Sequence, residues 1–149
     1  MFGFYGKTGS KVHVLQFQYG DMLLEGIEEY VKNENIQNAV IMTGLGTLDR
    51  CRVHYVASIG FPAQDTMQEW IDEPIGVAGM SGIIANGQPH IHMVFSAYSG
   101  DSKTFTGHLE HGCRVLYRVE MAIVEVDGLE LERVKNEKGI EELRNKNQP

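Results

Sequence analysis

Short apolar runs alternate with polar turns along this chain, and the pattern predicts a protein built mainly of β-strands. Within residues 11–18 apolar side chains fall on both faces of an expected strand, which indicates that both faces are covered. Asn86-Gly87, a dipeptide typical of tight hairpin turns, separates two further apolar runs. Residues 66–72 fit either an edge strand or a loop. The remaining strands are expected at residues 36–42, 50–58, 75–85, 91–95, 104–106 and 113–126, and residues 129–134 can return as a short strand.

One segment follows the helical period instead. After Gly20-Asp21, apolar residues recur three or four positions apart with acidic residues between them, which predicts an amphipathic helix with Asp21 as its N-cap. The apolar face consists of Leu23, Leu24, Ile27, Tyr30 and Val31. Residues 139–147 are highly charged, and we expect them to form a weakly held C-terminal helix.

These elements predict an α+β fold, a mixed, largely antiparallel β-sheet with one main helix in a single domain. The chain has 149 residues, of which 42% are hydrophobic, and this is enough for one core of ordinary size. We expect an irregular N-terminal arm at residues 1–10, the domain itself at residues 11–135, and a tail at residues 136–149 that can be helical.

Charge and cysteine content narrow the class of protein. The formal net charge of −7 disfavours nonspecific binding to a phosphate backbone, although it leaves room for a local basic patch. Cys51 and Cys113 have neither the C-x-x-C spacing of a redox motif nor the number needed for a disulfide scaffold. Without a signal peptide or a long apolar run, the chain is expected to be cytoplasmic.

Three of the six histidines gather around one predicted hairpin. Folding the chain back around Gly100 places His92 opposite His108, and a register two residues lower places His90 there instead. Because strand side chains alternate between faces, either register puts His90, His92 and His108 on the same face. Spacing therefore predicts that three imidazoles converge.

Three neutral imidazole nitrogens suit Zn²⁺ or a similar divalent metal, with a fourth position left for water. The alternative is a cluster of hydrogen-bonded, pH-sensitive histidines without a metal. His54 is the strongest candidate outside the hairpin, whereas His13 fits an ordinary strand residue and His111 has the wrong parity. Catalysis would also need a general base, for which the nearby candidates are Asp101, Glu110 and Glu120.

Several short motifs resemble the PPC (plant and prokaryote conserved) domain family. They run from Gly20-Asp21 through Gly44-Leu45-Gly46 to Gly87-Gln88-Pro89-His90-Ile91-His92 and Thr106-Gly107-His108-Leu109, so the resemblance covers most of residues 11–126. It differs at Thr106, where a second glycine is usual. The resemblance implies a compact α+β domain, a homotrimer, and a metal, zinc or a similar ion, bound by His90, His92 and His108.

The family resemblance says less about activity. In plants the domain follows an AT-hook that binds DNA, and no such segment occurs in this sequence. Our leading hypothesis is therefore a stand-alone cytoplasmic PPC-domain protein, homotrimeric and metal-binding, with no assigned activity. One alternative is a DNA-associated regulator with a basic face formed by Lys11, Arg50, Arg52, Arg114 and Arg118. A second is a metal-dependent hydrolase or lyase, which requires a pocket with a carboxylate beside the metal.

Overall fold

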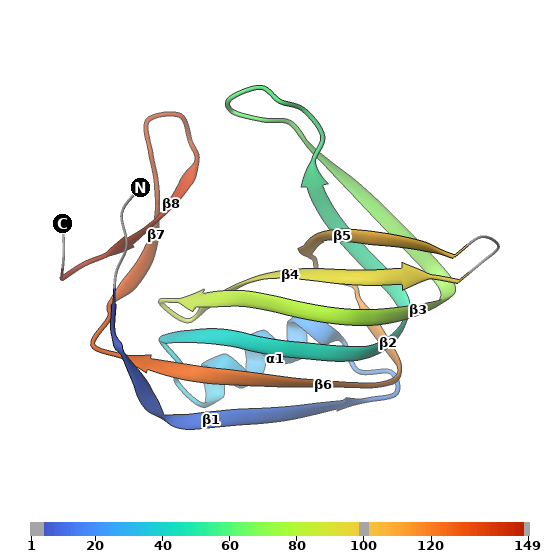
Figure 1. Cartoon of the computed structure of the whole chain (residues 1–149), viewed down its shortest axis with the longest axis horizontal. Coiled ribbons are helices and arrows are strands. Elements are labelled where there is room, and N and C mark those ends of the chain that lie inside the picture. The colour runs from blue at the N-terminus through green and yellow to red at the C-terminus, as the bar shows by residue number, and fades with distance from the viewer. Residues whose placement is uncertain (1–4, 99–101, 148–149) are drawn as a thin grey trace.

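The computed structural model of the chain describes residues 5–98 and 102–147 (Figure 1). One helix and eight strands occur in this part of the chain. In chain order they are β1 (Lys7–Gln18), α1 (Leu23–Asn33), β2 (Asn38–Val56), β3 (Asp65–Ala85), β4 (Gln88–Ala97), β5 (Lys103–Leu109), β6 (Arg114–Asp127), β7 (Leu131–Lys135) and β8 (Glu141–Asn145). No helix among the described residues combines the length and the apolar character needed to cross a membrane.

Six strands form the main sheet in the order β1-β6-β2-β3-β4-β5, and β7 and β8 form a separate hairpin. All pairings between these strands are antiparallel. This architecture confirms the predicted α+β class with one main helix. The end strand β5 also pairs with β2, so the strands β2 to β5 curl back on themselves.

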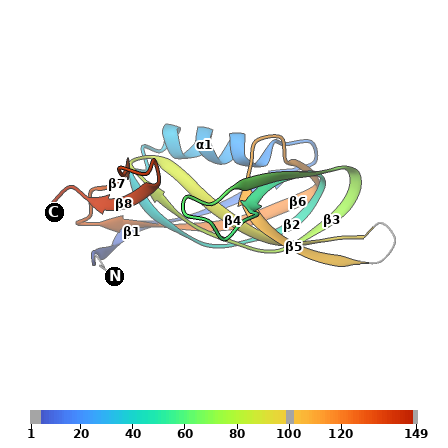
Figure 2. The same ribbon diagram turned by 90° about the horizontal axis from the view of Figure 1, so that it is seen from above.

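Helix α1 covers one face of the sheet, as Figure 2 shows, and the core lies between the two layers. Its apolar stripe, Leu23, Leu24, Ile27 and Val31, is buried, as the periodicity predicted. Where the strands curl, Trp70 packs edge-on against Phe95 at a ring-centroid distance of 5.0 Å. The opposite face of the sheet has no helix over it, and its side chains point away from this core.

Two local predictions are wrong. Helix α1 begins at Leu23 with Met22 as its N-cap, because the Asp21 carboxylate instead accepts a hydrogen bond from the Gln18 amide at 2.7 Å and closes the preceding turn. The expected C-terminal helix is absent from residues 136–147, which form a turn and strand β8. Asn136 explains this, since its side-chain oxygen accepts hydrogen bonds from the backbone amides of Lys138 and Ile140 and thereby fixes a hairpin turn.

The boundaries of two other strands also differ from expectation. Strand β1 starts at Lys7, inside the segment expected to be irregular, because Lys7 and Thr8 pair with the end of β6. Residues 66–72 belong to the long strand β3, so of the two alternatives the strand is correct. Residues 1–4 of the expected arm lie outside the described residues.

Candidate metal centre

The hairpin of β4 and β5 brings the three predicted histidines onto one face. His92 pairs with His108, which is the first of the two registers that parity allowed. The turn expected around Gly100 lies outside the described residues. The His108 ring centroid lies 4.8 Å from that of His90 and 5.5 Å from that of His92. The His90 and His92 rings are 5.3 Å apart and nearly parallel. The three imidazole rings therefore lie close together, as parity predicted.

A fourth histidine, His54, joins this cluster from β2. It pairs with His108 across the short contact between β2 and β5, and the two rings stack at 4.4 Å. We define the histidine cluster as His54, His90, His92 and His108. The sequence named His54 only as a candidate outside the hairpin, because no local pattern indicates that β2 pairs with β5.

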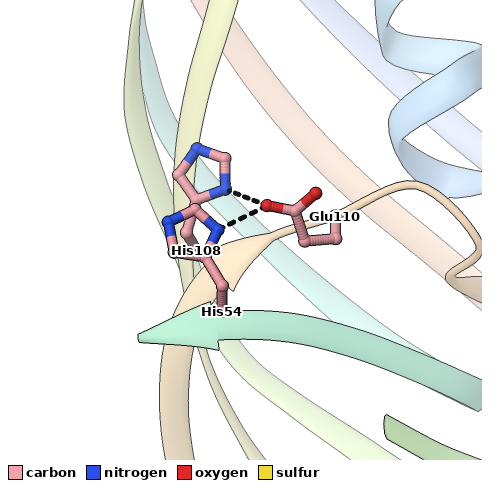
Figure 3. A group of neighbouring side chains, drawn as sticks. All are labelled: His54, His108 and Glu110. Carbon is pink, nitrogen blue, oxygen red and sulfur yellow. Dashed lines mark hydrogen bonds and ion pairs between the residues drawn. The ribbon is translucent and has the colours of Figure 1, made fainter. Parts of the chain in front are cut away.

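Glu110 links two members of the histidine cluster. One oxygen, Oε1, lies 2.5 Å from Nδ1 of His54 and 3.1 Å from Nδ1 of His108, so both imidazoles point to the same carboxylate (Figure 3). Burial alone raises the pKa of Glu110, but hydrogen bonds from His54 and the charge of His108 outweigh it and lower that pKa. The ionised carboxylate then accepts from both Nδ1–H groups.

This arrangement fits a metal. Among the described residues, His54, His108 and Glu110 form a group whose possible ligand atoms all lie within 4.8 Å of one another. When Glu110 fixes Nδ1 as the protonated nitrogen, Nε2 of His54 and His108 carries the lone pair that binds a metal. Glu110 can therefore act either as a ligand itself or as the carboxylate that orients histidine ligands.

His90 and His108 are held in the neutral form that binds metals. Burial, followed by the charges of His108, Arg133, His92 and His54, lowers the pKa of His90 to about 4. Burial and the charge of His54 likewise lower the pKa of His108, although Glu110 opposes this. At neutral pH both side chains are neutral, as metal coordination requires.

A cavity of about 450 Å³ adjoins the histidine cluster. Its floor includes His90 and His92, and the hairpin of β7 and β8 contributes Arg133, Glu141 and Leu143. The hydrolase alternative required a pocket with a carboxylate nearby, and Glu141, which the sequence did not single out, is a carboxylate in the lining of this cavity.

The other candidate residues lie elsewhere or form other contacts. His13 is buried and hydrogen-bonds to Tyr30 and Glu125, and His111 contacts Glu28 of α1, so neither belongs to the cluster. The candidate base Glu120 lies on β6, 3.7 Å from Arg118. Asp101 lies outside the described residues. Of the three candidate bases, Glu110 is the one that the fold brings to the histidines.

The predicted basic face is largely neutralised. Arg114 forms two hydrogen bonds of 2.8 and 2.9 Å with Asp49, Lys11 lies 3.9 Å from Glu125, and Arg118 lies beside Glu120. Three of the five basic residues proposed for DNA contact therefore each have a carboxylate partner. This pairing weakens the electrostatic attraction that a phosphate backbone would need.

Solved structures with the same fold come from several prokaryotes. A PPC protein of Pyrococcus horikoshii has a TM-score of 0.77 with 22% identity, covering 97% of each chain. A metal-containing protein of Archaeoglobus fulgidus has a TM-score of 0.76 with 24% identity over 93% of this chain and 95% of that one. A candidate DNA-binding protein of Bacteroides thetaiotaomicron has a TM-score of 0.72 with 14% identity over 94% of this chain and 96% of that one. At these identities the likeness shows the fold alone.

Sequence comparison gives the family. The bifunctional protein GlmU of Synechococcus sp. (strain JA-3-3Ab) is 25% identical over 124 residues, a match that covers 83% of this chain but 18% of that protein. The Plants and Prokaryotes Conserved (PCC) domain, the family that the sequence motifs resembled as PPC, matches residues 5–127. The chain therefore belongs to the PCC domain family.

Proposed function

We propose that this protein binds a divalent metal, zinc or a similar ion, through His90, His92 and His108. The observation that carries the proposal is the convergence of imidazoles beside a carboxylate, because Glu110 fixes the tautomer of His108 and leaves Nε2 for the metal. His54 and Glu110 act as positioning residues. When bound, the metal supplies a Lewis acid that can lower the pKa of a coordinated water.

Metal content after purification without a nickel column tests this proposal. We expect about one zinc per chain in the wild type, and substitution of any one proposed ligand, H90A, H92A or H108A, should reduce it to a trace. H54A should retain metal with weakened affinity, of the order of 10–100-fold, as for other outer-shell partners. The matched control is H111A, which removes a histidine that contacts Glu28 instead.

The opposite pattern would contradict the proposed ligand set. If H54A and E110Q lose the metal while H90A and H92A keep it, the ion is held by the His54, His108 and Glu110 group. If the wild type contains only trace metal, the whole proposal fails. Circular dichroism of each variant excludes unfolding as the cause of metal loss.

We also propose that the protein assembles as a homotrimer in the cytoplasm. The family resemblance implies three copies, and the open face of the sheet supports self-association because it carries apolar side chains. Val14 has an exposed fraction of 78%, Met42 of 61% and Leu45 of 50%. Exposed apolar patches of this kind mark interfaces on soluble proteins.

A second candidate function is metal-dependent hydrolysis or elimination on a small molecule. The cavity that adjoins His90 and His92 favours it, because a substrate there would lie beside the proposed metal with Glu141 in the wall. Association with DNA, suggested by the name of the Bacteroides protein, is less favoured, since the net charge is −7 and three candidate basic residues contact carboxylates.

A further inference from the structure

The cavity beside the histidine cluster has a wall that lies outside the family match. The match to the PCC domain family ends at residue 127, whereas Arg133, Glu141 and Leu143 belong to the following hairpin of β7 and β8. This hairpin lies at one end of the sheet, next to β3 and β4 in Figure 1. The ligand that fits the cavity is therefore determined in part by residues that the family motifs do not include.

Arg133 is fixed in this wall by two backbone hydrogen bonds. Its Nη1 donates to the carbonyl of Gln88 at 3.1 Å, and its Nη2 donates to the carbonyl of Ile83 at 3.0 Å. These bonds use two of the five N–H groups of the guanidinium and hold its plane in a single orientation. The side chain is thereby preorganised to bind a further acceptor.

The charge of Arg133 has no ion-pair partner among the described residues. Burial lowers the pKa of its guanidinium, and the nearby charge of Glu141 offsets this only in part. Arg133 lines the same cavity as His90 and His92. A partly buried cation that forms no direct ion pair is stabilised by an anion that enters the cavity.

We infer that this cavity binds a small molecule through a carboxylate or phosphate group held by Arg133 beside His90 and His92. Guanidinium groups pair with these oxyanions through two parallel hydrogen bonds. Glu141, on the same wall, accepts a hydrogen bond from a hydroxyl or amino group of the ligand. The inference rests on the proposed function in one respect, because a metal held by His90 and His92 would add positive charge to the cavity that these residues line.

Calorimetric titration of the full chain tests this inference, with inorganic phosphate and acetate as the probes. Each probe is added to zinc-loaded and to metal-free protein. The probe that binds with the higher affinity identifies the preferred oxyanion. We expect R133Q to bind that probe at least about tenfold more weakly than the wild type, as for loss of one charge-assisted contact. R133K keeps the positive charge but lacks the planar guanidinium, so its affinity for the probe should lie between those of R133Q and the wild type.

The matched control is R144Q, because Arg144 lies on the same hairpin but contacts Glu142 and does not line this cavity. Equal affinity in R133Q and R144Q, or no binding of either probe by the wild type in either state, would overturn the inference. If the protein takes up no zinc but R133Q still binds phosphate or acetate more weakly than the wild type does, the proposed function fails and the inference stands. If zinc binds and the probes do not, only the inference fails.

Discussion

At the scale of single residues, the same side chain takes different roles according to its partners. His13 is buried between Tyr30 and Glu125, with hydrogen bonds of 3.0 and 2.8 Å. His111 is exposed and contacts Glu28. In the histidine cluster, by contrast, His54 and His108 share the Glu110 carboxylate, and the rings of His90 and His92 lie beside that of His108. Parity along the strand separates His111 from His108, but only tertiary structure supplies each partner.

The pair of His111 and Glu28 gives a prediction about pH. The hydrogen bond from His111 to the Glu28 carboxylate raises the pKa of His111 above its ordinary value of 6.5. Glu28→Gln should therefore lower that pKa, as measured by NMR titration of the imidazole C–H protons. Glu29→Gln, with the same change of charge on the exposed side of α1, is the control.

The sign of the accompanying stability effect follows from linkage. Because the folded-state pKa of His111 is raised, the advantage of the wild type over E28Q is fully present below the unfolded-state pKa of about 6.5. It disappears as the pH rises through the folded-state pKa. Both side chains are about half exposed, so the difference in unfolding free energy should be small. An equal His111 pKa in E28Q and E29Q would contradict the assignment.

At the scale of elements, the sequence predicted features that depend on neighbouring residues, but it did not predict pairings between strands that lie far apart along the chain. Alternation and turn chemistry limited the register of β4 with β5 to two possibilities, both of which place His90, His92 and His108 on one face, and the structure has the one that pairs His92 with His108. The contact of His54 with His108 joins residues far apart in sequence, and no local signal specifies it. Strand β8 was mistaken for a helix because its charged residues carry little strand signal, and the turn that precedes it is fixed by hydrogen bonds to Asn136.

Helix α1 illustrates an element held by burial rather than by capping. Its N-cap residue Met22 makes no side-chain hydrogen bond, while Ile27 is fully buried against the sheet. Ile27→Ala should lower the free energy of unfolding by about 2–5 kcal/mol, as measured by urea denaturation at fixed protein concentration. Glu29→Ala, on the exposed side of the same helix, should change it by less than about 0.5 kcal/mol. Similar losses in both variants would contradict this account of the helix.

At the scale of the whole molecule, the open face of the sheet, which α1 does not cover, extends from β1 to the histidine cluster. The strand registers align one row of residues across five strands, Val12, Val124, Val40, Ile83 and His90. Four of the five are aliphatic, and the fifth belongs to the proposed metal site. A homotrimer that buries this face would thus bring partner chains close to the metal.

Substitution on the open face tests the assembly. Met42→Glu places a charge among the exposed apolar residues of β2, and burying that charge in an interface is unfavourable. Light scattering coupled to size exclusion should give about three times 16.7 kDa for the wild type and a single chain for M42E. Lys32→Glu on the helix side is the control and should leave the trimer intact. A monomeric wild type would contradict the proposed assembly.

The position of the β7–β8 hairpin has a consequence for how this fold can diversify. The imidazoles stand on the sheet, inside the family match, whereas Arg133 and Glu141 are added by a segment that follows it. If Arg133 holds the ligand as we infer, changes in the hairpin would alter which molecule is bound while the proposed metal ligands stay the same. Exchange of this hairpin between relatives would transfer selectivity as a unit, leaving the chemistry of the shared sheet unchanged.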